Sequence, residues 1–322
     1  MYNLSICFST KNRKTTLISC LQKIFLSKNI KKKKLEIIIF DGSKISSENE
    51  IFNLVYDKST FSIKYFHDPT DFGGLDGAFD RSVKNSSSEY CYISSDDDDY
   101  SPYLIENILN LIELKKDLYI LNTKIMDSQL EKTLEPNRLN LFKDYEFTYT
   151  KKKRIIDEKY IDQISYIGCV VVKKSIWANY NSEMYYNSFF GHFSNIFNSQ
   201  DQITIYIQKK PFINCRIDAE SWSSKHLLLW HFYYPQFKNM IYNKFTSLDR
   251  SEIVSHIPFK ILFKYYALGL LDDLSNIKVS IQLRNKLNRL FFINKKVAII
   301  LCLIHTYFNN NKILRYKLLK RI

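Results

Sequence analysis

The chain has 322 residues, of which 45% are hydrophobic and 15% aromatic, so it carries enough apolar material for a packed core and is not a disordered protein. Seven glycines and six prolines are too few for collagen-like or low-complexity classes. Lysine and arginine exceed aspartate and glutamate by 14, which predicts an anionic partner such as nucleic acid, a nucleotide or a membrane surface.

The first part of the chain alternates short apolar runs with amphipathic segments. In chain order we assign strand 4–9, helix 15–26, strands 35–40 and 63–66, helix 78–84 and strand 90–94. Strands that alternate with helices are typical of an α/β fold with a doubly wound, mostly parallel sheet. Ligands bind such sheets beyond the carboxyl ends of the strands, where Ser9, Asp41 and Asp96 fall.

The later part is less regular and includes a polar, charge-rich insertion at 130–158, to which we assign no structure. Around it we expect helix 102–114, strand 118–124, a core segment at 164–173, helix 193–197, and strands 203–208 and 212–217 that complete the sheet. Helical segments dominate after residue 222. We therefore expect one domain over residues 1–225 and a helical, basic C-terminal region over residues 226–322.

Four consecutive aspartates, Asp96 to Asp99, follow the predicted strand 90–94. Adjacent carboxylates repel one another unless a cation or solvent offsets their charge. One interpretation is a solvated acidic loop, and the other is a site for Mn²⁺ or Mg²⁺ that escorts a diphosphate. In an extended segment Asp96 and Asp98 share a face, and we expect both to be exposed at the strand end.

Three motifs in order resemble the family 2 glycosyltransferases, which have a GT-A fold. They are the opening strand and loop at 4–13, the second strand with its Asp-Gly-Ser turn at 36–43, and the DXD segment with its following proline at 95–102. Residues 74–83 and 216–222 are similar to segments of the sugar transferases of O-antigen and capsule assembly, including the abequosyltransferase-like branch. The resemblance covers about residues 1–235.

The resemblance implies roles for individual residues. Those placed at the nucleotide or its diphosphate are Ser9, Thr10, Asn12, Arg13, Asp41, Asp76, Arg81, Asp96 and Asp97. Asp96 and Asp98 become the metal pair, with a register that is open by one residue because the run has four members. Without the resemblance, Asp41 is equally well read as a turn or cap residue, and Arg81 as a surface residue.

The resemblance fails at the catalytic base. Inverting members of the family carry an acidic base, often in a Glu-Asp pair, and residues 189–193 offer His192 in its place. A histidine accepts a hydroxyl proton at neutral pH, so His192 is the predicted base or its hydrogen-bond partner. A structural histidine is the alternative interpretation, and Glu183 and Asp201 are rival bases. The reaction implied is a direct displacement that inverts the anomeric carbon of a nucleotide-sugar donor.

The C-terminal region carries most of the excess charge. No acidic residue follows Asp273, whereas eleven lysines and arginines do. Residues 284–322 therefore predict an interfacial helix on an anionic membrane, where a lipid-linked saccharide is the acceptor. Six scattered cysteines, a polar motif by residue 9 and a longest apolar stretch of about 12 residues predict a cytoplasmic protein without signal peptide or transmembrane span, peripheral on the inner face of the membrane.

Two other classes compete with a glycosyltransferase. A metal-dependent nucleotidyltransferase has a similar layered fold, but it opens with a glycine-rich phosphate loop, and residues 9–13 contain no glycine. A nucleic-acid-binding protein would use the basic tail, but that class leaves the aspartate run unexplained. We therefore expect no nucleic-acid partner.

Overall fold

The computed structural model describes residues 2–30, 34–54, 60–150, 156–178 and 181–216, together with Tyr234 and Phe237. The chain divides into two compact units, one formed by residues 1–216 with 237–244 and the other by residues 217–236 with 245–322. The account below concerns the first unit. The predicted basic helical region at 226–322 lies outside the described residues, except for Tyr234 and Phe237, and the predicted boundary at residue 225 stays a prediction.

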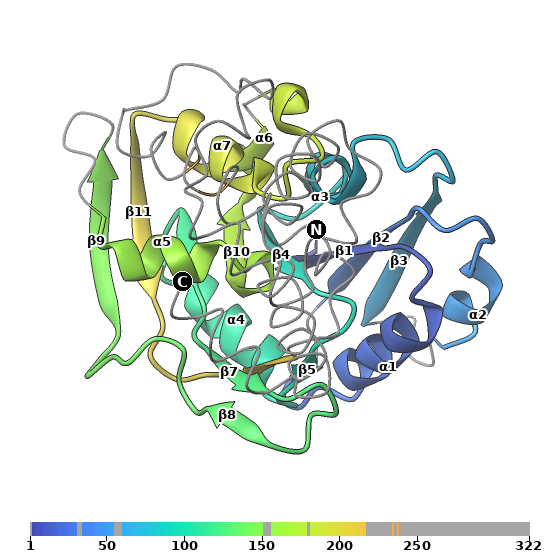
Figure 1. Ribbon diagram of the computed structural model, residues 1–322, viewed down its shortest axis with the longest axis horizontal. Coiled ribbons are helices and arrows are strands. Elements are labelled where there is room, and N and C mark those ends of the chain that lie inside the picture. The colour runs from blue at the N-terminus through green and yellow to red at the C-terminus, as the bar shows by residue number, and fades with distance from the viewer. Residues whose placement is uncertain are drawn as a thin grey trace, which may run out of the picture. The chain divides into compact units, whose positions relative to one another are not determined.

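An eight-stranded sheet runs through the first unit in the order β3-β2-β1-β4-β10-β6-β11-β9 (Figure 1). Its strands are β1 (Leu4–Thr10), β2 (Leu35–Asp41), β3 (Phe61–His67), β4 (Tyr90–Ser94), β6 (Leu118–Ile120), β9 (Tyr145–Thr150), β10 (Val170–Lys173) and β11 (Gln202–Ile207). Strands β3, β2, β1 and β4 are mutually parallel. Beyond them, β10 is antiparallel to both neighbours, β6 and β11 are parallel, and β9 is antiparallel to β11.

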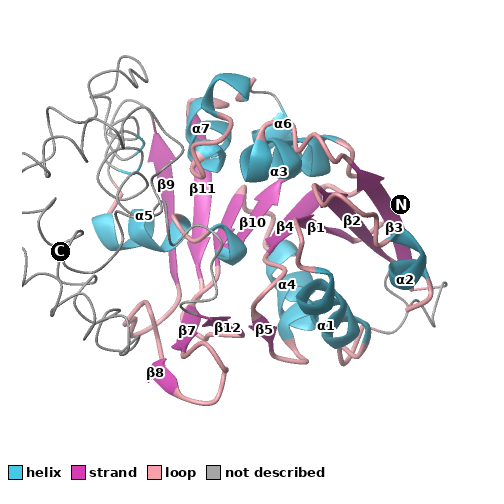
Figure 2. Cartoon of the chain, turned by 45° about the vertical axis from the view of Figure 1, so that its right-hand side comes forward, coloured by secondary structure: helices cyan, strands magenta, loops and turns pink. Residues whose placement is uncertain are grey.

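The parallel half confirms the predicted doubly wound sheet, and its sequence explains why it forms. Every residue of β2 is buried, as are all of β1 except Ser9, because helices cover both faces of a parallel sheet. Within the unit, helices α1 and α4 lie on one face, and α3, α6 and α7 lie on the other (Figure 2). The helices are α1 (Lys14–Phe25), α2 (Glu48–Phe52), α3 (Gly74–Lys84), α4 (Leu104–Ile112), α5 (Glu158–Ile164), α6 (Lys174–Ala178) and α7 (Gly191–Asn198).

A second, four-stranded sheet changes two of the predictions. It has the order β5-β12-β7-β8, formed by β5 (Asp99–Tyr100), β12 (Ile213–Arg216), β7 (Thr123–Met126) and β8 (Thr133–Glu135). The predicted strand 118–124 is therefore two strands in different sheets, and the predicted strand 212–217 does not complete the main sheet. The break falls at Asn122, whose side chain donates to the carbonyls of Leu139 and Lys209 and thereby ends β6.

The polar insertion at 130–158 contributes strands to both sheets, β8 to the smaller and β9 to an edge of the larger. All five cysteines within the described ranges are buried free thiols. Among the helices of those ranges, none combines the length and apolar character needed to cross a bilayer.

Candidate functional site

The aspartate run occupies the turn that links the two sheets. It follows the end of β4 at Ser94, and β5 begins at Asp99. Because β4 is parallel to β1, with Ser94 level with Phe8, the turn lies at the same sheet edge as the loop after β1. This is the edge at which an open parallel sheet binds its ligands. The predicted juxtaposition of the first loop and the aspartates is therefore present.

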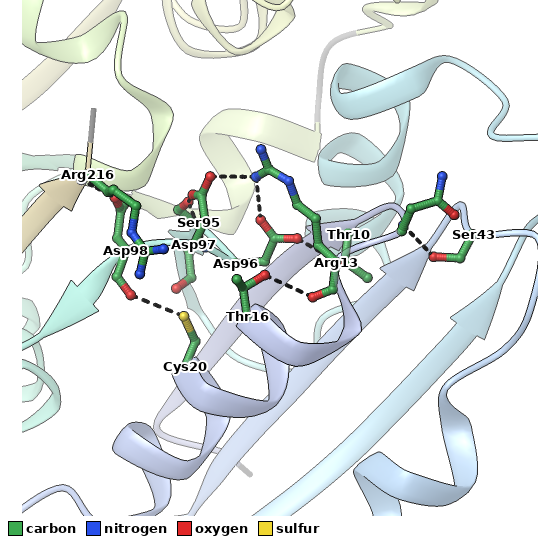
Figure 3. A network of polar contacts seen from close by, with 12 residues as sticks. Thr10, Arg13, Thr16, Cys20, Ser43, Ser95, Asp96, Asp97, Asp98 and Arg216 are labelled. Carbon is green, nitrogen blue, oxygen red and sulfur yellow. Dashed lines mark hydrogen bonds and ion pairs between the residues drawn. The ribbon is translucent and has the colours of Figure 1, made fainter. Parts of the chain in front are cut away.

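One half of the turn contacts the loop after β1 (Figure 3). Thr10 donates its hydroxyl to Asp96 Oδ2 at 2.7 Å. A single nitrogen of the Arg13 guanidinium, Nη1, lies 3.0 Å from Asp96 Oδ1 and 2.5 Å from Asp97 Oδ2. The Ser95 hydroxyl also donates to Asp97. One cationic nitrogen thus bridges two carboxylates, which shows that this part of the turn is shaped to hold positive charge.

The other half of the turn faces different partners. Asp98 accepts the Tyr166 hydroxyl on Oδ2 and the backbone N–H of Arg216 on Oδ1, the latter at 2.9 Å. Its carbonyl accepts the Cys20 thiol at 3.2 Å (Figure 3). These contacts fix Asp98 against the segment that follows α5 and against strand β12.

The fourth aspartate has a purely structural set of partners. Asp99 forms an ion pair with Lys23 of α1 and accepts the Asn214 amide at 2.8 Å. These contacts join helix α1, strand β5 and strand β12. Asp99 is therefore held by a cation and an amide of the chain itself, and the predicted metal pair Asp96 and Asp98 stays a prediction.

Asp96 and Asp98 are each only 4% exposed, so the expectation that both are exposed at the strand end is wrong. They are buried because four donors from three other segments enclose them. Burial, with the charge of Asp97 next in effect, raises the pKa of Asp96 to about 6 and that of Asp98 to about 7. Removing ionised carboxylates from water is costly, and a nearby cation offsets the cost.

The donor set of the turn fits a hard divalent cation, because carboxylate oxygens are the ligands that Mg²⁺ and Mn²⁺ prefer. In the described ranges no three or more His, Cys, Asp or Glu side chains converge as a preformed cage. The metal assignment for Asp96 and Asp98 stays a prediction. It is supported by three carboxylates in one turn that have a single cationic partner among the described residues, Arg13, and by the habit of Mg²⁺ of taking one or two protein carboxylates with phosphate oxygens.

The remaining residues predicted at the nucleotide line the ends of β1 and β2. Ser9 is half-buried, and Asn12 has a left-handed φ of 57° and donates its backbone N–H to the Ser43 hydroxyl at 2.7 Å. Asp41 is buried and accepts the Ser43 N–H at 2.8 Å and the Tyr65 hydroxyl. The structure thus gives Asp41 the turn-forming contacts that the sequence allowed as an alternative.

Asp76 has contacts that differ from its predicted role at the donor. It is buried, and its carboxylate accepts the backbone N–H groups of Ser188, Phe189 and Gly191 at 2.8, 2.8 and 3.0 Å. Burial raises its pKa to about 6 in spite of these bonds. Asp76 therefore joins α3 to the start of α7, and its predicted role at the donor stays a prediction.

Arg81 likewise supports a loop. It donates to the Phe72 carbonyl at 2.7 Å and to Asp68 at 3.2 Å, and its guanidinium lies 5.0 Å from the centre of the Phe40 ring. The same loop reaches the ends of β1 and β2 through an ion pair of Asp71 with Lys11 at 2.6 Å. Arg81 thus shapes a loop at the candidate site, and the diphosphate contact predicted for it stays a prediction.

His192 is only 1% exposed, at the start of α7, where it packs 4.8 Å from the Phe193 ring. Its Nε2 lies 2.9 Å from the Ile164 carbonyl oxygen, and burial lowers its pKa to about 4. A carbonyl only accepts, so Nε2 carries the proton, and Nδ1 is an acceptor without a hydrogen-bond partner in the part of the chain described. The rival bases Glu183 and Asp201 are both exposed.

Sequence reasoning missed three contributors to the site: the Tyr166 hydroxyl, the Arg216 backbone N–H and the Ser95 hydroxyl. Tyr166 is separated from Asp98 by 68 residues, within a segment that we assigned to the core. No local pattern marks such a contact. Ser95 directly precedes the aspartates, and its position beside four carboxylates was the one available signal.

Comparison with known proteins agrees with this geometry. Residues 5–180 match the family described as Glycosyl transferase family 2. Abequosyltransferase RfbV of Salmonella typhimurium strain LT2 is 27% identical over 267 residues, which span 77% of this chain and 78% of that protein.

Among solved structures, the chain superposes on S. aureus TarS 1–349 in complex with UDP, with a TM-score of 0.55 and 13% identity over 85% of this chain and 81% of that one. The TarS complex with UDP-GlcNAc gives a TM-score of 0.53 and 12% identity over the same shares of the two chains. The likeness to TarS confirms the predicted GT-A fold.

Proposed function

Because the chain belongs to glycosyl transferase family 2, we propose that it moves a hexose or deoxyhexose from a nucleotide-diphosphate donor to a hydroxyl of a lipid-linked saccharide, with inversion at the anomeric carbon. The product belongs to a surface polysaccharide such as O-antigen or capsule. The similarity to an abequosyltransferase supports both the sugar class and the pathway class. The TarS complexes with UDP and UDP-GlcNAc support a nucleotide-sugar donor.

The observation that carries the proposal is the aspartate turn against the loop after β1. Asp96 and Asp97 share the Arg13 guanidinium, and Thr10 closes the same cluster at the ligand-binding edge of the sheet. A diphosphate carries two or more negative charges and is repelled by carboxylates. A cation must therefore lie between the diphosphate and the acidic residues of the turn. Arg13 supplies one positive charge within the cluster.

The residues that would hold a divalent cation are Asp96 and Asp98, with Asp97 beside them. When bound, Mn²⁺ or Mg²⁺ offsets the charge that develops on the departing diphosphate. The chain's own groups then have two tasks. Arg13 and Thr10 hold Asp96 in place, and the loop shaped by Arg81 and the Lys11–Asp71 ion pair forms the neighbouring wall at the ends of β1 and β2.

For the acceptor we propose His192 as the general base, acting through Nδ1. The Ile164 carbonyl fixes the Nε2–H tautomer, so the Nδ1 lone pair is the one able to take a hydroxyl proton. The lowered pKa keeps the imidazole neutral throughout the neutral range, and it also makes Nδ1 a weaker base than that of an exposed histidine. General base action of this kind contributes about 10²- to 10⁴-fold in rate. Glu183 and Asp201 are the alternatives.

The membrane part of the proposal rests on the sequence. The basic stretch at 284–322 is proposed to hold the enzyme peripherally on the cytoplasmic face of the membrane, next to lipid-linked acceptors.

Ligand binding tests the proposal directly. Thermal melts of the full chain with UDP, CDP, GDP and dTDP, each with and without Mn²⁺, should show one nucleotide that raises the melting temperature strongly only when Mn²⁺ is present, because a ligand that binds the native state alone stabilises it. Adenosine triphosphate with Mn²⁺ serves as the control for the nucleotidyltransferase alternative. No stabilisation by any nucleoside diphosphate, or stabilisation independent of Mn²⁺, would contradict the proposal.

A further inference from the structure

Asp98 differs from its neighbours in the charge of its partners. Asp96 and Asp97 both accept from the positively charged Arg13. Asp98, which is equally buried, accepts from the neutral Tyr166 hydroxyl and the neutral Arg216 N–H. The negative charge of Asp98 is therefore offset less than the charges of Asp96 and Asp97. The orientation of its carboxylate depends on those two hydrogen bonds.

The Tyr166 ring is held by its surroundings. It lies between the end of α5 and the 3₁₀ helix η1 (Ile167–Cys169). A Cβ atom at Gly168 would stand 2.5 Å from the Tyr166 hydroxyl oxygen, so the ring takes its place only because residue 168 is glycine. The Arg138 guanidinium lies over the same ring, 5.8 Å from its centre. A ring confined in this way directs its hydroxyl to one acceptor, Asp98.

The same short junction also contacts the proposed base. The Ile164 carbonyl, two residues before Tyr166, accepts from His192 Nε2 at 2.9 Å. The Gln163 amide donates to the Leu121 carbonyl at 2.9 Å and anchors the junction to the end of β6. Residues 163–168 therefore connect the aspartate turn with the start of α7 through anchored contacts.

We infer that Tyr166 is a positioning residue whose hydroxyl fixes the Asp98 carboxylate and thereby raises the cation-dependent affinity of the site for a nucleoside diphosphate. This inference rests on the proposed function, since it concerns the same site. Groups that hydrogen-bond to metal-binding side chains commonly change metal affinity by about 10- to 100-fold when they are removed.

The test is calorimetric binding of the nucleoside diphosphate selected in the thermal screen, with and without Mn²⁺, for the wild type and five variants. Tyr166→Phe removes the hydroxyl and keeps the ring. Tyr92→Phe is the matched control, because the Tyr92 hydroxyl is also buried and donates to the Gly168 carbonyl at 3.2 Å rather than to an aspartate. Asp98→Asn and the Tyr166→Phe/Asp98→Asn double variant complete a double-mutant cycle. Binding is measured below the melting transition of every variant.

We expect Tyr166→Phe to reduce the Mn²⁺-induced gain in nucleotide affinity by about tenfold or more, with Tyr92→Phe unchanged. In the Asp98→Asn background the same change should have no further effect. Gly168→Ala, which forces the ring to shift, should reproduce the loss. The inference is overturned if Tyr166→Phe and Tyr92→Phe change the Mn²⁺-induced gain in affinity equally. It is also overturned if Tyr166→Phe lowers that gain as much in the Asp98→Asn background as in the wild type. An Asp98→Asn variant with a normal Mn²⁺ response instead contradicts the proposed metal site itself.

Discussion

Arg13 pairs with two carboxylates of the aspartate turn, and Arg13→Met should show its contribution as a pH-dependent loss of stability. Methionine keeps most of the side-chain volume and removes the charge that bridges Asp96 and Asp97. Without it, ionised Asp96 stays buried with the Thr10 hydroxyl as its one side-chain donor among the described residues, and the variant can relieve the cost by protonating that carboxyl.

The pKa of Asp96 sets the size of this effect. A carboxyl whose pKa is raised in the folded state contributes stability that is present below its unfolded pKa and is lost as the pH rises through the folded value of about 6. Protonating Asp96 at pH 8 costs about 3 kcal/mol, from two pH units at about 1.4 kcal/mol each. At pH 5.5 the cost is close to zero. The loss caused by Arg13→Met should therefore be larger at pH 8, by up to about 3 kcal/mol.

Thermal or urea melts at pH 5.5 and pH 8, in a chelator, measure the difference. For a unit of this size about 3 kcal/mol corresponds to about 6–12 °C in Tm. Lys14→Met is the matched control, because Lys14 is the next residue and forms an exposed ion pair with Glu50 at 2.8 Å. That variant should change little at either pH. An Arg13→Met loss that is equal at both pH values, or larger at pH 5.5, would refute the reasoning.

Three further outcomes are expected. Asp98→Asn and Asp96→Asn should each abolish transfer and Mn²⁺-enhanced nucleotide binding; full activity in both would exclude the metal pair. For Asp98→Asn, Tm at pH 8 should stay at or above the wild-type value, because the buried charge removed there accepts only from neutral donors among the described residues. His192→Ala should lower kcat by about 10²-fold or more with nucleotide affinity unchanged, and a near-normal kcat would return His192 to a structural role. The acid limb of the wild-type pH profile should lie near pH 4, because burial lowers the pKa of the imidazole to about 4. Deleting residues 284–322 should release the protein from anionic vesicles with nucleotide binding intact, whereas unchanged vesicle binding would show that another segment is the anchor.

The parallel half of the fold was predictable because its signals are local. Strands such as residues 35–40 are apolar runs interrupted only by Glu36, and burial on both faces of a parallel sheet favours such runs. The split near Asn122 was not predictable, because its partners Leu139 and Lys209 are 17 and 87 residues away in the sequence. Local patterns carry no information on contacts of that kind.

The candidate site divides in the same way. The aspartate turn and the loop after β1 were found from sequence because each has a composition that stands out within a few residues. Tyr166 and the burial of Asp98 were not, since they depend on how the end of α5 meets the turn. Asp76 was assigned to the donor side because its motif resembles the family, whereas its carboxylate is taken up by the N–H groups before α7.

Release of nucleoside diphosphate from a panel of nucleotide sugars, with a lipid-linked saccharide fraction as acceptor and Mn²⁺ present, tests the central claim most directly. The account predicts that the wild type releases nucleoside diphosphate from one donor and only when the acceptor fraction is present. The new linkage should have the inverted anomeric configuration by NMR, and Asp98→Asn should release no nucleoside diphosphate. Release from no donor, or equal release by wild type and Asp98→Asn, would contradict the claim that this site performs glycosyl transfer.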